Sequence, residues 1–231
     1  MEAPQVLGGR FEARGVLVEV ISGEGGDDSK HFAEQLFIAY LAYLNRNGVK
    51  AELEETGPSK FSFVCEDARA ESLFEHESGC HCVQRIPKND RGGRKHSSYV
   101  AVSVTKLQYQ NNQMKESDLE ESFQRGHGKG GQHQNKTSSA VRLRHKPSGL
   151  EVFINGRSQQ ANRKVARMCL AGKISQFIVS GSKPNNFGGA GRGDKVRTYN
   201  FADSRITDHR TNAKVFTPDD IIKDGKFELL R

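Results

Sequence analysis

A glycine-rich loop at residues 125–137 is the part of the sequence best suited to chemistry. It reads Arg-Gly-His-Gly-Lys-Gly-Gly-Gln-His-Gln-Asn-Lys-Thr, so four glycines lie among basic and amide side chains. Glycine adopts positive φ readily, and the backbone of Gly130, Gly131 and Gln132 can therefore approach a phosphate or a reacting carbonyl closely. A dinucleotide site is not indicated, because no strand directly precedes the loop and no βαβ unit follows it.

Two histidines flank these glycines. His127 and His133 have the right chemistry for a general base, but structural or phosphate-contact roles are favoured for both. A second glycine run, residues 189–193, is interpreted as linker rather than as a phosphate cradle.

His76, Cys80, His81 and Cys82 raise the question of a metal site. Cys80-His81-Cys82 is better explained as a strand in which the two thiols share one face, and the paired C-x2-C spacings of zinc sites are missing. Four cysteines are also too few for a disulfide framework in a chain of 231 residues. We therefore predict structural cysteines, no metal, no cofactor and a reducing compartment.

Positive charge is concentrated in one segment. The formal net charge is +7, yet residues 125–173 hold eleven Lys and Arg against one acid, Glu151, while the remaining residues hold 24 basic and 27 acidic side chains. Such a confined cationic segment is typical of a polyanion partner, and its glycine and aromatic content favours nucleic acid over lipid. The sequence contains neither a run of 18 apolar residues nor a signal peptide, so we expect the cytoplasm or an organelle matrix and no membrane partner.

The elements around the loop are predicted to form a small domain at residues 125–180. Alternating apolar residues predict strands at 140–144 and 150–154, joined by a turn at 146–149. A helix follows from residue 158 to about 179, and its expected buried side is Ala161, Val165, Met168, Cys169 and Phe177. The polar stretch 108–124 and the Gly-rich stretch 181–193 are predicted to be linkers at its two ends.

The rest of the chain is predicted to form a second, mixed unit from residues 1–107, with a short extension at 1–15, and residues 194–231. Its strand patterns lie at 16–21, 49–54, 61–65, 81–86, 98–104, 196–201 and 215–216, and shorter helices are expected at 68–74 and 218–222. A long helix capped by Asp27 or Asp28 should bury Phe32, Leu36, Phe37, Tyr40, Tyr43 and Leu44 and end at Asn47-Gly48. Residues 87–94 form an exposed loop between two strands, a suitable place for ligand recognition.

The loop sequence closely resembles the tip of bacterial-type class I peptide chain release factors. The likeness continues through residues 135–142, 157–159 and 162–164. It extends to Gly25-Gly26-Asp27, Glu77-Ser78-Gly79, residues 83–87, residues 93–98, residues 197–201 and Thr207-Asp208-His209-Arg210, and so covers nearly the whole chain from about Val16. The fold that it implies is α+β, a mixed decoding superdomain with a small α/β domain, the GGQ domain, inserted on two flexible linkers.

This resemblance implies a role for each part of the loop. Gly130 and Gly131 would permit the backbone geometry in which the N–H of Gln132 donates to the oxyanion formed when water attacks the ester of peptidyl-tRNA. Ribosomal RNA and the tRNA would supply the rest of the catalysis, and Gln132 is a candidate for N5-methylation by a glutamine methyltransferase. The residues expected to contact ribosomal RNA or tRNA are Lys129, Lys136, Arg142, Arg144, Arg163 and Lys164.

The implied partners are ribosomal RNA of both subunits, an mRNA stop codon and the P-site peptidyl-tRNA, bound by a monomer. The codon-reading residues would be Gly25, Asp28, Gln84, Pro87, Lys88, Asn89, His96 and Ser97. His96 would stack on the second base and Gln84 would lie on the third-base side. Pro87-Lys88-Asn89 departs from the family's P-x-T tripeptide, Ser97 stands in place of the usual Thr, and Asp28 stands in place of a Glu that meets the first base.

Two segments bear on the choice of codon. Residues 90–93 resemble the other, S-P-F, branch of the family, whereas residues 198–201 and 208–210 resemble the P-x-T branch and favour UAA and UAG. The family has a long helical N-terminal domain. The roughly fifteen residues before the first predicted strand contain no counterpart to it.

Three functions remain open. The first is a compact, codon-dependent release factor. The second is a rescue or surveillance peptidyl-tRNA hydrolase acting on stalled or damaged ribosomes, which the altered tripeptide would suit. The third, a non-catalytic RNA-binding protein with a borrowed fold, is disfavoured by the intact Gly-Gly-Gln.

Overall fold

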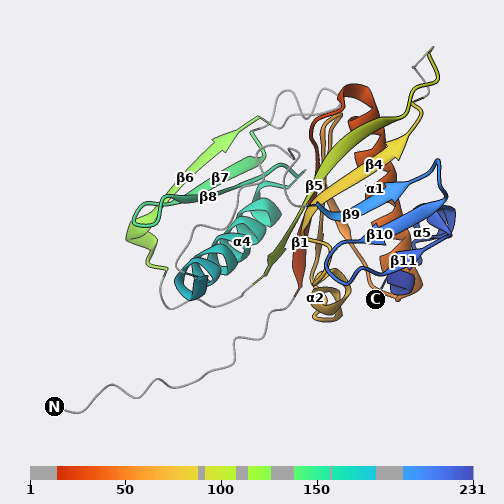
Figure 1. The fold of residues 1–231 in the computed structure, drawn as a ribbon. Coiled ribbons are helices and arrows are strands. Elements are labelled where there is room, and N and C mark those ends of the chain that lie inside the picture. Colours follow the sequence, from red (N-terminus) through yellow and green to blue (C-terminus); the bar gives the residue numbers. More distant parts are fainter. Residues whose placement is uncertain are drawn as a thin grey trace.

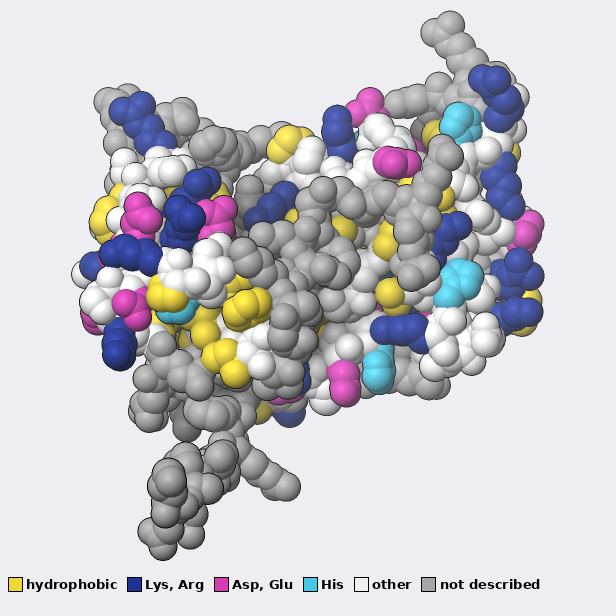
Figure 2. Space-filling model, turned by 60° about the vertical axis from the view of Figure 1, so that its left-hand side comes forward, with side chains coloured by type: hydrophobic (Ala, Val, Ile, Leu, Met, Phe, Trp, Pro, Cys, Tyr) yellow, Lys and Arg dark blue, Asp and Glu magenta, His cyan; other side chains and the backbone are white. Residues whose placement is uncertain are grey.

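The chain forms a large unit built on an eight-stranded sheet and a small unit built on a three-stranded sheet (Figure 1). The computed structural model describes residues 15–87, 92–107, 114–125, 138–156, 158–180 and 195–230. Figure 2 shows the small unit on the left of the molecule and the large unit on the right. The predicted α+β class is confirmed.

The large sheet joins strands from both ends of the chain, in the order β11-β10-β9-β4-β5-β1-β3-β2. β4 (Gly79–Arg85) and β9 (Lys195–Asn200) pair in parallel, and the other neighbours are antiparallel. The remaining strands are β1 (Val16–Ser22), β2 (Glu52–Thr56), β3 (Lys60–Cys65), β5 (His96–Lys106), β10 (Arg205–Asp208) and β11 (Lys214–Val215). The pairing of β4 with β9 therefore makes one unit of the first and last segments of the chain.

The small unit contains β6 (Leu119–Gln124), β7 (Ala140–His145), β8 (Leu150–Ile154) and α4 (Gln159–Ser180), with a 3-10 turn, η1 (Glu116–Asp118), before β6. The predicted hairpin and helix are confirmed, although Ala161 is exposed whereas Val165, Met168 and Cys169 are buried. β6 pairs with β7 along its whole length. Residues 119–124, which we expected in a linker, therefore belong to the small unit. The predicted linker at 181–193 lies outside the described residues.

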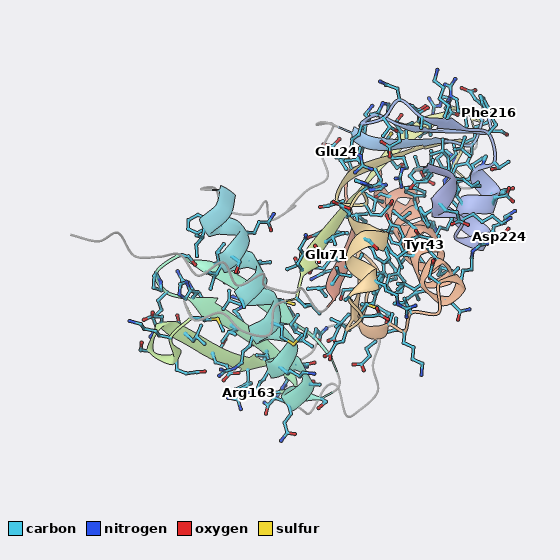
Figure 3. All side chains as sticks on the ribbon, turned by 90° about the horizontal axis from the view of Figure 1, so that it is seen from below. Glu24, Tyr43, Glu71, Arg163, Phe216 and Asp224 are labelled. Carbon is cyan, nitrogen blue, oxygen red and sulfur yellow. The ribbon has the colours of Figure 1, made fainter. Side chains whose placement is uncertain are left out.

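The small unit packs against one face of the large sheet. Leu17 of β1, Val64 of β3 and Leu107 after β5 lie in the same buried apolar cluster as the core of the small unit. The helix α4 comes so close to β5 that a Cβ at Gly172 would overlap the carbonyl oxygen of Lys106. Figure 3 shows the two units side by side, with Glu71 of α2 (Arg69–Phe74) at their junction.

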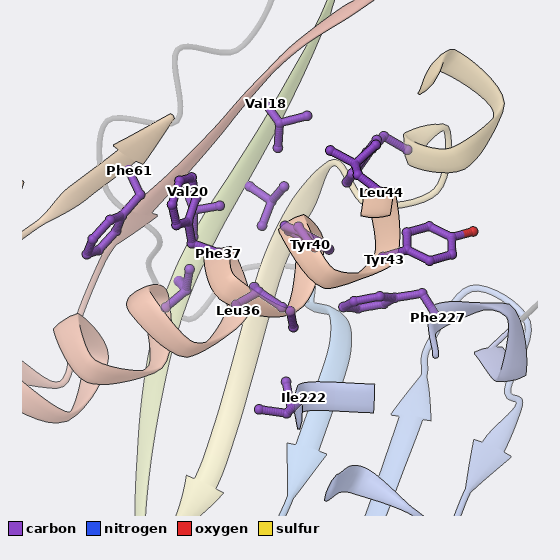
Figure 4. Close-up of a cluster of buried hydrophobic side chains, with 14 of the residues drawn as sticks. Val18, Val20, Leu36, Phe37, Tyr40, Tyr43, Leu44, Phe61, Ile222 and Phe227 are labelled. Carbon is purple, nitrogen blue, oxygen red and sulfur yellow. The ribbon is translucent and has the colours of Figure 1, made fainter. Parts of the chain in front are cut away.

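The opposite face of the large sheet is covered by α1 (Gly26–Arg46). All six residues of its predicted apolar stripe are buried, and they pack on β1, β3, α5 (Pro218–Asp224) and η2 (Phe227–Leu230) (Figure 4). The rings of Tyr40 and Phe227 lie 4.9 Å apart and those of Phe37 and Phe61 lie 5.3 Å apart. Aromatic contacts of this kind bury much apolar surface, which holds the C-terminal segment against α1.

The start of α1 differs from the prediction. Its N-cap is Gly25, with φ of 125°, and no side chain makes a capping hydrogen bond. Asp27 instead pairs with Lys30 at 3.0 Å, and Asp28 binds Arg85 and Ser98. A Cβ at residue 25 would overlap the Ser98 side chain, so the close approach of α1 to β5 requires glycine there.

Candidate functional site

The described residues show how the glycine-rich loop is held, while the loop itself lies outside them. Gly130, Gly131 and Gln132 fall in this undescribed part, as do Lys129 and Lys136. β6 ends at Gln124 and β7 begins at Ala140, and these two residues are direct cross-strand partners. The two stems of the loop therefore leave the sheet side by side.

The first turns of α4 fix the stem that leads into β7. Asn162 is 1% exposed, and its Nδ2 donates to the carbonyl oxygens of Ser139 at 2.8 Å and Gly156 at 2.9 Å. Gln159 Nε2 donates to the carbonyl oxygen of Ser138 at 3.0 Å. Because buried carbonyl groups need partners, Asn162 ties the loop stem, the end of β8 and α4 into one rigid base.

The predicted phosphate contacts fall into two groups. Arg142 and Arg144 point outward from β7 into solvent, and the Arg142 guanidinium lies 6.0 Å from the ring centroid of Phe153. Arg163 instead makes two 2.7 Å hydrogen bonds to Glu121, and Lys164 lies 2.8 Å from Glu66 of the large unit. The α4 cations thus pair within the protein, and those of β7 face outward.

The predicted codon-reading residues come from three elements that meet at one end of the large sheet. Gly25 caps α1 and Asp28 lies in its first turn. Gln84 lies near the end of β4, Pro87 lies two residues beyond that strand, and His96 and Ser97 begin β5. Gln84 and Ser97 are cross-strand partners on one face, and the next pair, Arg85 and His96, lies on the opposite face. Lys88 and Asn89 lie outside the described residues.

Arg85, which was not among the predicted site residues, organises this end of the sheet. Its Nε donates to Asp28 Oδ1 at 2.7 Å and its Nη1 donates to Gln35 at 2.7 Å. Ser98 Oγ donates to the other carboxylate oxygen of Asp28 at 2.8 Å, and the Asp28 side chain is only 9% exposed. Both oxygens of Asp28 are therefore engaged inside the protein, and its contact with a base stays a prediction.

A second polar network, buried and ionic, is centred on Arg197 of β9. Arg197 is 1% exposed and donates to Glu77 at 2.7 and 3.0 Å and to Asp208 at 3.1 Å, while the Tyr40 hydroxyl donates to Glu77 at 2.9 Å. Burial alone would raise the pKa of Glu77, but the Arg197 guanidinium holds it below its ordinary value. The network joins α1, β9, β10 and the turn before β4.

His81 packs against this network and stays neutral. Burial, reinforced by Arg197, lowers the pKa of His81 to about 4. Its Nε2 lies 2.8 Å from the carbonyl oxygen of Glu77, so this nitrogen carries the proton and donates it. Neither His81 nor Arg197 was a predicted site residue. Hydrophobic periodicity gives no signal for a charge that is buried by pairing.

The four cysteines lie in the interior of the described ranges. All four are buried and none forms a disulfide within the described residues, and Cys80 and Cys82 share one face of β4 with Tyr99. In the part of the chain that the structure describes, no group of three or more His, Cys, Asp or Glu side chains is arranged to hold a metal ion. None of the helices in these ranges is long and apolar enough to cross a membrane.

Two domain families match the chain. The PCRF domain matches residues 2–102 and the RF-1 domain matches residues 107–210. Peptide chain release factor 1 of Acetivibrio thermocellus is 35% identical over 94% of this chain and 64% of its own length. Peptide chain release factor 1 of Leptospira biflexa serovar Patoc is 37% identical over 85% of this chain and 60% of its own length. This chain thus spans less than two thirds of the length of these relatives.

A solved structure has the same fold. RF2 of Thermus thermophilus superposes with a TM-score of 0.77 and 24% sequence identity, over 97% of this chain and 68% of that chain. At this identity the likeness establishes the fold.

Proposed function

Because the chain belongs to the family of class I peptide chain release factors, we propose that it terminates translation by hydrolysing peptidyl-tRNA on the ribosome. The observation that carries the proposal is the Gly130-Gly131-Gln132 sequence on a loop whose two stems leave adjacent strands and whose β7 stem is held by Asn162. A reactive tip needs such a base, because hydrolysis depends on holding a donor within a fraction of an ångström of its target.

In this mechanism the backbone N–H of Gln132 donates to the oxyanion that forms when water attacks the ester. One such donor lowers the barrier by about 2.7–4 kcal/mol in other acyl-transfer enzymes. Gly130 and Gly131 allow the backbone to take the required path, and the Gln132 side chain shapes the site and admits water. The remaining catalytic groups come from ribosomal RNA and the tRNA, so the activity requires the ribosome.

The other end of the molecule reads the codon. Gln84 and Ser97 share one face at the end of the sheet, Gly25 and Asp28 begin α1 beside them, and Pro87 and His96 flank the loop between β4 and β5. With Lys88 and Asn89 they form the proposed stop-codon surface. Residues 198–201 and 208–210, which resemble the P-x-T branch, favour UAA and UAG over UGA.

Additional contacts and modifications follow from the same proposal. Arg142 and Arg144 on the exposed face of β7 are the described cations best placed for ribosomal RNA or tRNA. The protein acts as a monomer in the cytoplasm or an organelle matrix, and a glutamine methyltransferase modifies Gln132.

The test is a release assay with purified ribosomes that hold fMet-tRNA in the P site. UAA or UAG in the A site should release formyl-methionine, UGA and a sense codon should not, and Gly131→Ala or Gln132→Pro should abolish release without abolishing ribosome binding. No release with any codon would overturn the proposal.

The second candidate is a rescue hydrolase, and the observation that favours it is Asn89 in the codon-reading tripeptide. Equal release at stop and sense codons, or on ribosomes with an empty A site, would select this candidate over codon-dependent termination.

A further inference from the structure

The C-terminal strands carry a charge pattern that the proposed sites do not use. Residues 195–217 contain five Lys and Arg and two acids, whereas residues 218–230 contain two Lys and four acids. Two of the five cations, Arg197 and Arg210, are bound by Asp208. Lys195, Arg205 and Lys214 remain, with His209 beside them.

Strand register places these side chains on one face. Thr207 of β10 is the cross-strand partner of both Thr198 and Lys214, and Arg205 is the partner of Asn200. Partners across a ladder point to the same side of a sheet. A register shift between Cys80 and His81 in the pairing of β4 with β9 brings Lys195 onto the same face, where it lies over the Tyr99 ring, and His209 lies 2.7 Å from Thr198. We call Lys195, Thr198, Arg205, Thr207, His209 and Lys214 the strand-face patch. Figure 2 shows Lys, Arg and His side chains on the right-hand side of the molecule, over the large unit.

The patch continues the edge proposed to read the codon. In the register of the sheet, Ser97 pairs with Gln84, Gln84 with Asn200, and Asn200 with Arg205. A single row of side chains therefore leads from the candidate codon surface to the patch. The small unit packs on the other half of this face, through Leu17, Val64 and Leu107.

Thr198 Oγ1 and His209 Nε2 of the patch lie 2.7 Å apart, whereas its cations make only long contacts with protein groups. The Arg205 side chain is 39% exposed, and its Nη2 lies 3.9 Å from Asp203 Oδ2. The same Asp203 oxygen is 3.8 Å from Lys95, so one exposed carboxylate is shared between two cations at long distance. Lys195 Nζ lies 5.7 Å from the centroid of the Tyr99 ring.

We propose that the strand-face patch binds the phosphate backbone of RNA next to the codon surface. Lys, Arg and Thr side chains are typical phosphate contacts, and the alternating row of cations and hydroxyls offers a donor at each step along a chain of phosphates. A lipid surface would require apolar side chains among the cations, and the patch presents threonines instead. The ribosomal part of this inference rests on the proposed function, whereas RNA binding by the free protein does not.

The test compares two triple variants with the same loss of charge. The first is Lys195→Gln, Arg205→Gln and Lys214→Gln in the patch, and the control is Lys30→Gln, Lys50→Gln and Lys223→Gln on exposed positions elsewhere in the large unit. Affinity for a fluorescein-labelled RNA oligonucleotide is titrated over a series of salt concentrations. In parallel, KM and kcat for formyl-methionine release are measured on ribosomes.

The patch variant should bind RNA about tenfold or more weakly than the control at moderate salt, and its salt slope should fall by roughly 2–3, since each lost phosphate contact removes about 0.7–0.9. KM for ribosomes should rise while kcat stays the same. Identical RNA affinity and slope in both variants would overturn the proposal even if release is normal. A loss on ribosomes with no loss on free RNA would assign the patch to an acidic protein and also overturn it. If the wild type releases no formyl-methionine, the RNA titration still tests whether the patch binds RNA.

Discussion

Arg197 shows how much of this fold depends on single polar residues. One guanidinium contacts carboxylates from two different segments, and Arg210 at the rim, 2.9 Å from Asp208, balances the second negative charge. Buried ion pairs add little net stability compared with apolar side chains of the same size, but removing one partner leaves an uncompensated charge. The network therefore fixes the positions of β9 and β10 relative to α1 more than it strengthens the core.

His81 gives a pH test of this network. Its pKa falls from an ordinary value of about 6.5 to about 4 in the folded state, so the unfolded chain binds the extra proton. The contribution of neutral His81 to the free energy of unfolding is complete above pH 6.5. It decreases by at most about 3 kcal/mol as the pH falls towards 4. We expect urea unfolding of the wild type to lose stability over this range relative to His81→Gln. The exposed control His31→Gln should follow the wild type, and a His81→Gln curve that also follows it would contradict the assignment.

At the scale of elements, hydrophobic periodicity predicts the helices and strands whose buried side chains are apolar. It misses those whose buried side chains are charged and paired. The stripes of α1 and α4 and the hairpin of β7 and β8 are readable because their buried side chains are large and regularly spaced. β10 could not be predicted from periodicity, because it has four residues and its Asp208 is buried by pairing with Arg197. β6 is hidden for a related reason: its sequence, Leu-Glu-Glu-Ser-Phe-Gln, is polar, and Glu121 is occupied by Arg163.

The site shows the same limit. The sequence indicates which loops carry the candidate residues, since glycine runs and turn residues are local signals. The contact of Arg85 with Asp28, 57 positions earlier, depends on the order of strands in the sheet and has no local signal.

Gly172 tests how α4 is seated on the large sheet. Alanine at this position should favour the helix itself by about 1 kcal/mol, yet its Cβ would overlap the Lys106 carbonyl oxygen, which is backbone and cannot move aside cheaply. We expect Gly172→Ala to loosen the docked small unit while leaving its own helix content intact. Carbodiimide cross-linking of Lys164 to Glu66, 2.8 Å apart, should fall at least severalfold. The exposed substitution Gln160→Ala should not change the yield, and an unchanged yield in Gly172→Ala would show that the interface tolerates the methyl group.

For the whole molecule, the junction between the two units contains a group that titrates near neutral pH. Glu54 of β2 reaches towards the small unit, where its Oε2 would lie 2.8 Å from a Cβ at Gly156. That oxygen is buried and has no hydrogen-bond partner among the described residues. Burial, with a smaller effect from Glu52, raises the pKa of Glu54 to about 7. The other charges on the elements around it are Glu19, which pairs with Lys60, and Lys173 and Lys164 of α4.

Docking of the two units should therefore weaken as pH rises. The docked state binds the proton more tightly than the separated state, so docking is fully favoured below the ordinary carboxyl pKa of about 4.5 and loses at most about 3 kcal/mol as pH passes through 7. We expect the radius of gyration from small-angle scattering to increase between pH 5 and 8 in the wild type and to stay constant in Glu54→Gln, which keeps the shape and removes the charge. Glu52→Gln should shift the transition to lower pH, because it removes the neighbouring negative charge.

Carboxyl NMR tests the same link between the Glu54 pKa and docking without relying on molecular size. In the wild type the Glu54 carboxyl should titrate near 7, and in Gly172→Ala, where the small unit is released, it should return towards 4.5. A midpoint near 4.5 in the docked wild type would show that water reaches this carboxylate and that the junction does not respond to pH. A midpoint near 7 in both proteins would mean that the large unit alone buries Glu54, and docking would then be independent of its charge.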